Sequence, residues 1–278
     1  IYTAPDDCDP WDEQVWFDCN PALDDFRSLE EMMAFAEQAK LMPQKEAAFR
    51  NLYLNQRVET SGKFISVAAY DACVGRIPDL SGRPVWAGLD LAAVSDTTSI
   101  VLIPEPLPGE PFYVIPICWC PSESIAERTK KDRVPYALWQ RLGFIEPISG
   151  GVTRYEPIIT KIGELKSQYD LKGCVYDRWG SQKIIQDLEE MGVPVVEFGQ
   201  GYKSMAAPVQ ELERLVLEQG IVFPENDLLK WQFQNIVIEQ DAAGNRKFSK
   251  GKASEKIDLC VCVLMALDAV IRNGGAVV

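Results

Sequence analysis

The order of short apolar runs along the chain constrains its fold more than any other feature of the sequence. Three runs rich in β-branched and other apolar residues come first, at residues 85–91, 97–103 and 112–119. Turn-forming segments separate these runs, which predicts three consecutive antiparallel strands. Two further strands then alternate with helices, with strands at 172–177 and 193–198 and helices at 157–169, 181–191 and 203–219. This order predicts an α/β fold with a mixed sheet and helices on both faces.

The segments on either side have weaker patterns. Residues 1–26 are rich in Asp and Pro and are expected to be irregular, and a capping box at Ser28 to Glu31 predicts a helix to about residue 40. We expect a second helix at 43–54 and a connecting segment at 55–84. Residues 121–142 are expected to be partly helical, and Gly220 is expected at the C′ position after the helix 203–219. The chain then predicts a short strand, a helix, a hairpin and a buried helix, at 221–223, 227–234, 235–249 and 255–271.

The formal net charge of −13 argues against a protein that simply wraps nucleic acid in a basic surface. The charge is uneven, however, because residues 1–31 contain ten acids and only one base, Arg27. The remaining 247 residues have 31 acids and 27 bases and are therefore close to balanced. The acidic character belongs mainly to the N-terminal segment.

The chain has no histidine, which excludes Ser-His-Asp and Cys-His catalysis and any zinc site that uses histidine. Its eight cysteines include no C-x-x-C pair, so we expect reduced and mostly buried thiols rather than a zinc site. No run of 18 apolar residues is present, so we expect no membrane span.

Two carboxylates fall at the ends of predicted strands. Asp90 follows Trp86 and Gly88 on one face of an apolar strand, and Gly88 is expected to leave that face open beside the acid. Asp177 ends the strand 172–177, where ligands bind in open α/β sheets. The alternatives are a turn hydrogen bond for Asp90 and an ordinary loop position for Asp177.

Three more acids are candidates for the same site. Asp258 lies in the first turn of the last helix, where the helix dipole favours an anion even without a functional role. Asp96 follows the first strand and can reach the pocket of Asp90, although an acid in a β-turn is the simpler interpretation. Glu255 is interpreted as a charge at the start of the helix.

Three convergent carboxylates without histidine or cysteine ligands describe a site for a hard cation, Mg²⁺ or Mn²⁺. Two such ions can activate a water molecule and stabilise the leaving oxygen of a phosphodiester. This chemistry requires no histidine base.

Several short motifs together resemble the C-terminal nuclease domain of the large terminase subunit of tailed bacteriophages, which has the RNase H-like fold. They are Gly88-Leu-Asp90-Leu-Ala with Asp96-Thr-Thr, Val175-Tyr-Asp177-Arg, and Lys256-Ile-Asp258 with Met265-Ala-Leu. The segments 16–21 and 49–55 resemble the part that joins the motor domain of that family to its nuclease. The resemblance divides the chain into a linker with a helical remnant at 1–78 and a nuclease domain at 79–278.

The resemblance implies a metal-dependent endonuclease that cuts concatemeric viral DNA during packaging into the procapsid. Asp90, Asp177 and Asp258 would be catalytic and would bind two Mg²⁺ or Mn²⁺ ions, with Asp96 as a further metal ligand. The implied partners are double-stranded viral DNA, the portal protein and the small terminase subunit, in the host cytoplasm and without a membrane.

The chain departs from the family pattern in two respects. Glu255 and Ile257 stand where several members have a histidine or another aspartate, so the outer ligands are open. The motif G-x-x-x-x-G-K-[S/T] of the ATPase motor is absent. We therefore expect the nuclease part without its motor, and oligomers only together with that motor.

DNA contacts are expected from a basic group that leads into the last helix. Its members are Arg246, Lys247, Lys250, Lys252 and Lys256, with Arg178 beside Asp177 as a further candidate. The alternative is that these residues form a solvated hairpin tip. Arg128, Lys130, Lys131 and Arg133 form a second basic group.

Two other functions are compatible with the sequence. One is another RNase H-like nuclease of the junction resolvase or transposase type. The other is a non-catalytic docking module of a packaging complex, in which the acidic N-terminal segment binds a basic partner and the three aspartates are structural.

Overall fold

The computed structural model describes residues 2–5, 8–56, 64–91, 96–177, 182–249 and 256–273. Contacts between Cα atoms divide the chain into two compact units, Ile1–Ala72 and Cys73–Val278. Residues 73–75, which the sequence placed in the linker segment, pair with Phe223 of the second unit.

The first unit is helical. Its helices are α1 (Glu13–Cys19), α2 (Leu29–Leu41), α3 (Pro43–Tyr53) and α4 (Val67–Ala72). The capping of α2 is as predicted, because the Ser28 hydroxyl accepts a hydrogen bond from the Glu31 amide at 3.2 Å. Phe49 is fully buried and contacts a ring of aromatic side chains, which are Trp11, Trp16, Phe35 and Tyr53.

The predictions missed two helices of this unit. We expected irregular chain where α1 forms, but Asp12 caps the Gln14 amide and Trp16 is buried. We expected a connecting segment where α4 forms, but Ser66 caps the Ala69 amide and Tyr70 is buried. In both helices a single polar cap and one buried aromatic stabilise a helix that is too short to show a clear periodicity.

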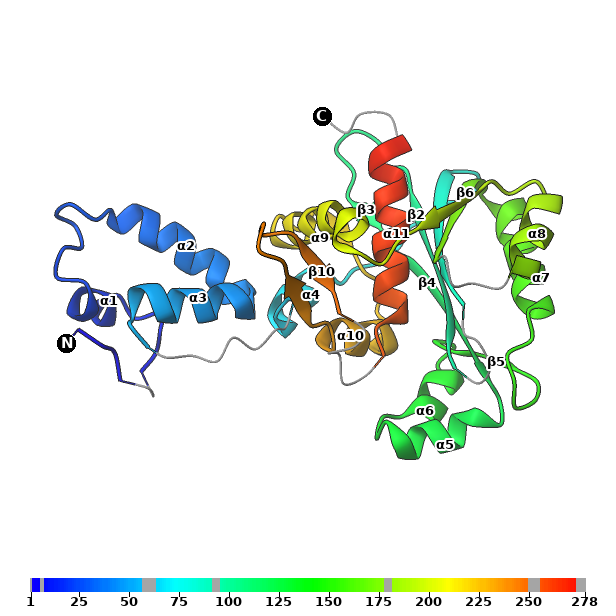
Figure 1. The fold of residues 1–278 in the computed structure, drawn as a ribbon, viewed down its shortest axis with the longest axis horizontal. Coiled ribbons are helices and arrows are strands. Elements are labelled where there is room, and N and C mark those ends of the chain that lie inside the picture. Colours follow the sequence, from blue (N-terminus) through cyan, green and yellow to red (C-terminus); the bar gives the residue numbers. More distant parts are fainter. Residues whose placement is uncertain are drawn as a thin grey trace. The chain divides into compact units, whose positions relative to one another are not determined.

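The second unit is built on a six-stranded mixed sheet, which confirms the predicted α/β fold (Figure 1). The strand order is β5-β4-β2-β1-β6-β7. The pairs β1–β2 and β2–β4 are antiparallel, whereas β4–β5, β1–β6 and β6–β7 are parallel. The strands are β1 (Pro84–Asp90), β2 (Thr98–Pro104), β4 (Ile115–Pro121), β5 (Glu146–Ile148), β6 (Asp170–Asp177) and β7 (Val195–Phe198).

Two details of the sheet differ from the prediction. The run 112–119 is divided into β3 (Phe112–Tyr113) and β4, because β3 pairs in parallel with β8 (Ile221–Val222) in a separate two-stranded sheet. β5 was not predicted, since a strand of three residues has no detectable alternation. The predicted hairpin is present as β9 (Ile238–Gln240) and β10 (Arg246–Phe248).

Helices cover both faces of the sheet. α7 (Glu156–Gln168) and α8 (Gln182–Glu190) pack on one face, where Ile162 and Leu188 join Val85, Ala87 and Leu89 in one core. α11 (Asp258–Asn273) packs on the other face, with α9 (Tyr202–Leu217) beside it (Figure 1). The remaining helices of this unit are α5 (Ser124–Lys131), α6 (Tyr136–Arg141) and α10 (Asp227–Gln234).

The end of α9 corrects one prediction. Gln219, and not Gly220, occupies the left-handed C′ position, with φ of 53°. The Gly220 amide bonds to the Leu215 carbonyl at 2.7 Å and the Gln219 amide to the Val216 carbonyl at 3.3 Å. These two bonds form a Schellman motif with Gly220 at C″.

Gly88 allows α11 to approach the sheet closely. A Cβ atom at this position would lie 2.2 Å from the Cys262 carbonyl oxygen and 2.9 Å from the Met265 Cβ. The prediction that Gly88 leaves an open face beside Asp90 is therefore wrong, because the backbone of α11 fills that space. α11 is buried along most of its length, as its sequence predicts.

All eight cysteines are thiols, and seven of them are buried. Within the described ranges, no helix has both the length and the apolar character needed to cross a membrane.

The contact at Gly88 predicts that Gly88→Ala destabilises the protein by about 1–3 kcal/mol, because the backbones of β1 and α11 have to move apart to make room for the methyl group. Urea denaturation measures the loss of free energy of unfolding. Gly163→Ala in α7 is the control. Its new methyl group would meet only the flexible end of Met191, at 3.1 Å, and alanine favours a helix by up to about 1 kcal/mol. Equal stabilities of the two variants would contradict the close approach of α11.

Candidate active site

Two aspartates lie at the carboxyl ends of adjacent parallel strands. Asp90 ends β1 and Asp177 ends β6, and the last paired residues before them are Leu89 and Tyr176. Asp90 is 8% exposed, so its carboxyl group is largely removed from bulk water. The Gln200 side chain, just beyond β7, donates a hydrogen bond of 2.6 Å to Asp177 Oδ2. The ends of these strands thus form one acidic edge of the sheet.

Asp258 is the first residue of α11 and is tied to the same sheet. Its Oδ2 accepts a hydrogen bond of 2.8 Å from the hydroxyl of Thr97, the residue directly before β2. Two residues further on, Ser99 pairs with Asp90 across the β1–β2 ladder. One turn along α11, the Cys262 thiol donates to the Ser99 carbonyl at 3.2 Å. These bonds hold the start of α11 at the end of the sheet that carries Asp90.

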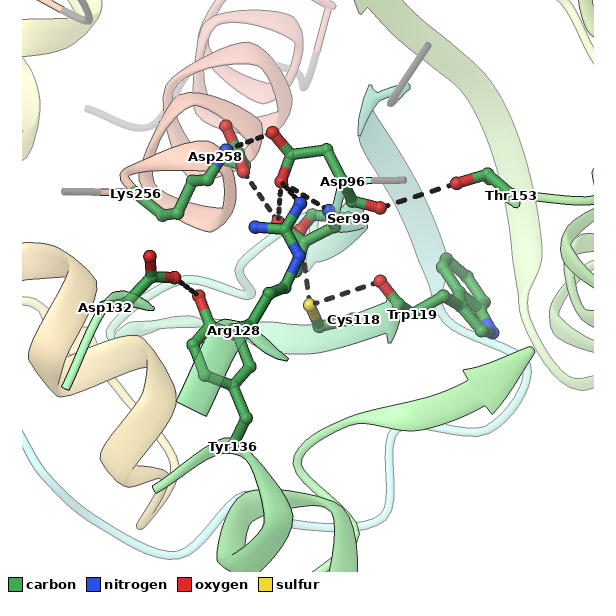
Figure 2. A network of polar contacts seen from close by, with 11 residues as sticks. Asp96, Ser99, Cys118, Trp119, Arg128, Asp132, Tyr136, Thr153, Lys256 and Asp258 are labelled. Carbon is green, nitrogen blue, oxygen red and sulfur yellow. Dashed lines mark hydrogen bonds and ion pairs between the residues drawn. The ribbon is translucent and has the colours of Figure 1, made fainter. Parts of the chain in front are cut away.

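Asp96 is the centre of an ionic junction. The Lys256 ammonium bonds to Oδ2, and the Arg128 guanidinium lies 3.0 Å from Oδ1 (Figure 2). The Thr97 amide donates to Oδ1 at 2.7 Å. Burial acts to raise the pKa of Asp96, but the hydrogen bond and charge of Lys256 and the charge of Arg128 bring it below its usual value. Asp96 is therefore ionised at neutral pH and joins α5 to the start of α11.

The donor chemistry of this edge suits a hard cation, because Asp90, Asp177 and Asp258 offer only carboxylate oxygens. Within the described part of the chain, however, no three acidic or cysteine side chains lie close enough together to hold a metal ion. Asp96, the fourth predicted ligand, is engaged by Lys256 and Arg128 instead.

The predicted DNA-binding residues are mostly engaged with acids where the structure describes them. Arg246 forms an ion pair with Glu213, and Lys247 lies 3.1 Å from Glu239. Lys256 belongs to the junction at Asp96. Three of the predicted DNA-binding residues, Arg178, Lys250 and Lys252, lie outside the described residues, as does Glu255. DNA binding by this group stays a prediction.

Three residues of the site were not predicted as part of it. Gln200 follows β7, and it could have been identified by the same rule that singled out Asp177, that ligands bind beyond the carboxyl ends of strands. Arg128 belonged to the second basic group, but no pattern in the sequence connects α5 with Asp96. No sequence feature distinguishes Thr97 from other polar residues next to a strand. Only its long-range hydrogen bond with Asp258 connects it to the site.

The mixed strand order, with helices on both faces and acids at the carboxyl ends of two adjacent parallel strands, defines an RNase H-like nuclease domain. The sequence matches the family model described as terminase large subunit, endonuclease domain, over residues 1–273. It is 39% identical over 281 residues to the terminase large subunit of Enterobacteria phage HK97, which covers 99% of this chain and 55% of that protein. The chain belongs to the family of terminase large subunit endonuclease domains.

A solved structure of the HK97 protein gives the same assignment. The crystal structure of the HK97 bacteriophage large terminase superposes with a TM-score of 0.69 and 39% identity, covering 97% of this chain and 56% of that one. The large terminase nuclease from thermophilic phage G20c with bound magnesium has a TM-score of 0.47 and 13% identity, covering 73% and 96% of the two chains. The chain thus spans about half the length of the HK97 relative that it matches.

The ion pair of Arg246 predicts a structural role. Glu213 has only 10% of its side chain exposed, so Arg246→Ala leaves a buried carboxylate without its partner. We expect a loss of about 3 kcal/mol in urea denaturation without DNA or metal. Arg214→Ala, which removes exposed ion pairs on the same helix as Glu213, is the control and should lose at most about 1 kcal/mol. Similar losses in the two variants would show that the ion pair between Arg246 and Glu213 does not stabilise the contact of the β9–β10 hairpin with α9.

Proposed function

We propose that this chain is the metal-dependent endonuclease of a viral DNA-packaging enzyme and that it cuts concatemeric viral DNA. The proposal depends on one observation, the placement of Asp90 and Asp177 at adjacent strand ends with Asp258 hydrogen-bonded to the same edge. The family of endonuclease domains to which the chain belongs supports this reaction.

Asp90, Asp177 and Asp258 would hold two Mg²⁺ or Mn²⁺ ions. When bound, such ions supply an activated water and stabilise charge on the leaving oxygen of the phosphodiester. The carboxylates are matched to this role because no histidine is present to act as a base or ligand.

The residues around the three acids orient them. Gln200 orients the carboxylate of Asp177 through its Oδ2, and Thr97 orients the carboxylate of Asp258 through its Oδ2. Lys256 and Arg128 keep Asp96 ionised and engaged. Asp96 would become a metal ligand only after these two cations move to the phosphates of the DNA.

The substrate in this proposal is double-stranded viral DNA in the host cytoplasm. The portal protein and the small terminase subunit are the proposed partners in packaging, and oligomers are expected only together with a motor domain. The acidic segment at residues 1–31 is suited to a protein partner rather than to DNA, because like charges repel.

The assignment predicts that Asp90→Ala and Asp258→Ala each abolish nicking of a supercoiled plasmid in Mn²⁺ or Mg²⁺, and that a chelator abolishes the activity of the parent. Asp170→Ala is the matched control, because Asp170 begins the strand that Asp177 ends and is exposed. It should cut at the rate of the parent. Activity of either site variant equal to that of Asp170→Ala would show that the acids are not catalytic.

Phosphate contacts near the start of α11 predict that Lys252→Ala reduces the salt dependence of DNA binding. Loss of one contact should reduce the slope of log K against log salt by about 1. Binding is measured in chelator with an inactive Asp90→Ala background, so that the DNA stays intact. Lys172→Ala, at the opposite end of β6, should retain the full slope. An unchanged slope for Lys252→Ala would remove this residue from the DNA surface.

A further inference from the structure

The first turn of α11 lacks a capping residue of its own. The Val261 amide bonds to the Ile257 carbonyl at 3.0 Å, which makes Ile257 the N-cap residue. An N-cap side chain normally accepts a hydrogen bond from the second or third amide of its helix, and isoleucine has no acceptor. The second amide, that of Leu259, therefore needs an acceptor from elsewhere in the protein.

Gln232 of α10 supplies this acceptor. Its Oε1 accepts a hydrogen bond of 2.7 Å from the Leu259 amide, and its side chain is fully buried. Its Nε2 has no hydrogen-bond partner among the described residues. Burying a side-chain amide whose NH₂ group has no partner is unfavourable, so a glutamine at this position is better explained by its bond to α11 than by packing alone.

A second residue of the same region holds the chain just before α11. Asn235, which ends α10, donates through Nδ2 to the Lys256 carbonyl at 3.4 Å. Lys256 in turn bonds to Asp96, and Asp258 accepts from Thr97. α10 lies beside the start of α11 (Figure 1), and the contacts of Gln232 and Asn235 act on residues within two positions of Asp258.

We propose that Gln232, assisted by Asn235, is a positioning residue of the nuclease site that caps α11 from a neighbouring helix and thereby fixes the Asp258 carboxylate. The inference rests on the proposed function in one respect, the role of Asp258 as a metal ligand. A partner that orients a ligand from outside the first coordination sphere typically changes metal affinity by about 10- to 100-fold.

The test compares Gln232→Met with Gln234→Met. Gln234 lies on the same helix and also has a buried Nε2 without a described partner, but no described hydrogen bond joins its side chain to α11. Calorimetry measures Mn²⁺ binding to the intact chain, and hydrogen exchange measures the protection of the Leu259 amide without metal. Gln232→Met should weaken Mn²⁺ binding by about tenfold or more, and should accelerate exchange at Leu259. Gln234→Met should match the parent in both measurements.

A rescue variant separates capping from simple loss of packing. Gln232→Glu retains an oxygen at the same reach and should restore slow exchange at Leu259. If Gln232→Met does not fold, Asn235→Ala is measured instead, and Mn²⁺ binding weaker than in the parent supports the proposal. Mn²⁺ binding equal to that of the parent in every folded variant, or equal losses in Gln232→Met and Gln234→Met, would overturn it.

Plasmid nicking by the parent distinguishes a failure of the proposed function from a failure of the positioning role. A parent that binds no Mn²⁺ and cuts no DNA contradicts the proposed function itself. A parent that binds and cuts, while Gln232→Met behaves in the same way, contradicts only the positioning role.

Discussion

The direct contact of α11 with the backbone of β1 is the constraint on which the second unit depends. It exists because position 88 has no side chain, so that the Cys262 carbonyl reaches the space that a Cβ would occupy. The helix is then held at a depth that brings its first residue, Asp258, to the end of the sheet. The same packing that buries this apolar helix also locates an acid of the candidate site.

Much of this fold follows from local patterns in the sequence. The antiparallel strands, the βα units, the hairpin and the buried last helix all have a clear period or a turn signal, and they lie close to the predicted residues. The elements that were missed are short, namely α1, α4 and β5, and they depend on a single cap or on pairing with a distant strand. The division of the run 112–119 depends on β8, whose position relative to β3 no local pattern can give.

The candidate site was predictable to a smaller extent. Three aspartates stand out in the sequence because they lie at a strand end or a helix start, where an acid can meet a ligand. The resemblance to a known family assigned all three, Asp90, Asp177 and Asp258, to one site. The ionic junction was not predictable, because Arg128, Asp96 and Lys256 come from three segments that meet only after folding. The basic residues of the hairpin were predicted to bind DNA because their acidic partners were not recognised in the sequence. In the structure Arg246 pairs with Glu213, and Lys247 pairs with Glu239.

α11 follows all the strands of the sheet in the sequence, which has a consequence for folding during synthesis. The bond between Thr97 and Asp258 joins residues 161 positions apart, so the acidic edge is incomplete until almost the whole domain has been translated. A nascent chain with the sheet strands already made still lacks both the helix that covers one face and the acid it carries. Long-range closure of this kind is slow compared with local folding. Completion of the acidic edge is therefore expected to be a late step in the folding of this domain.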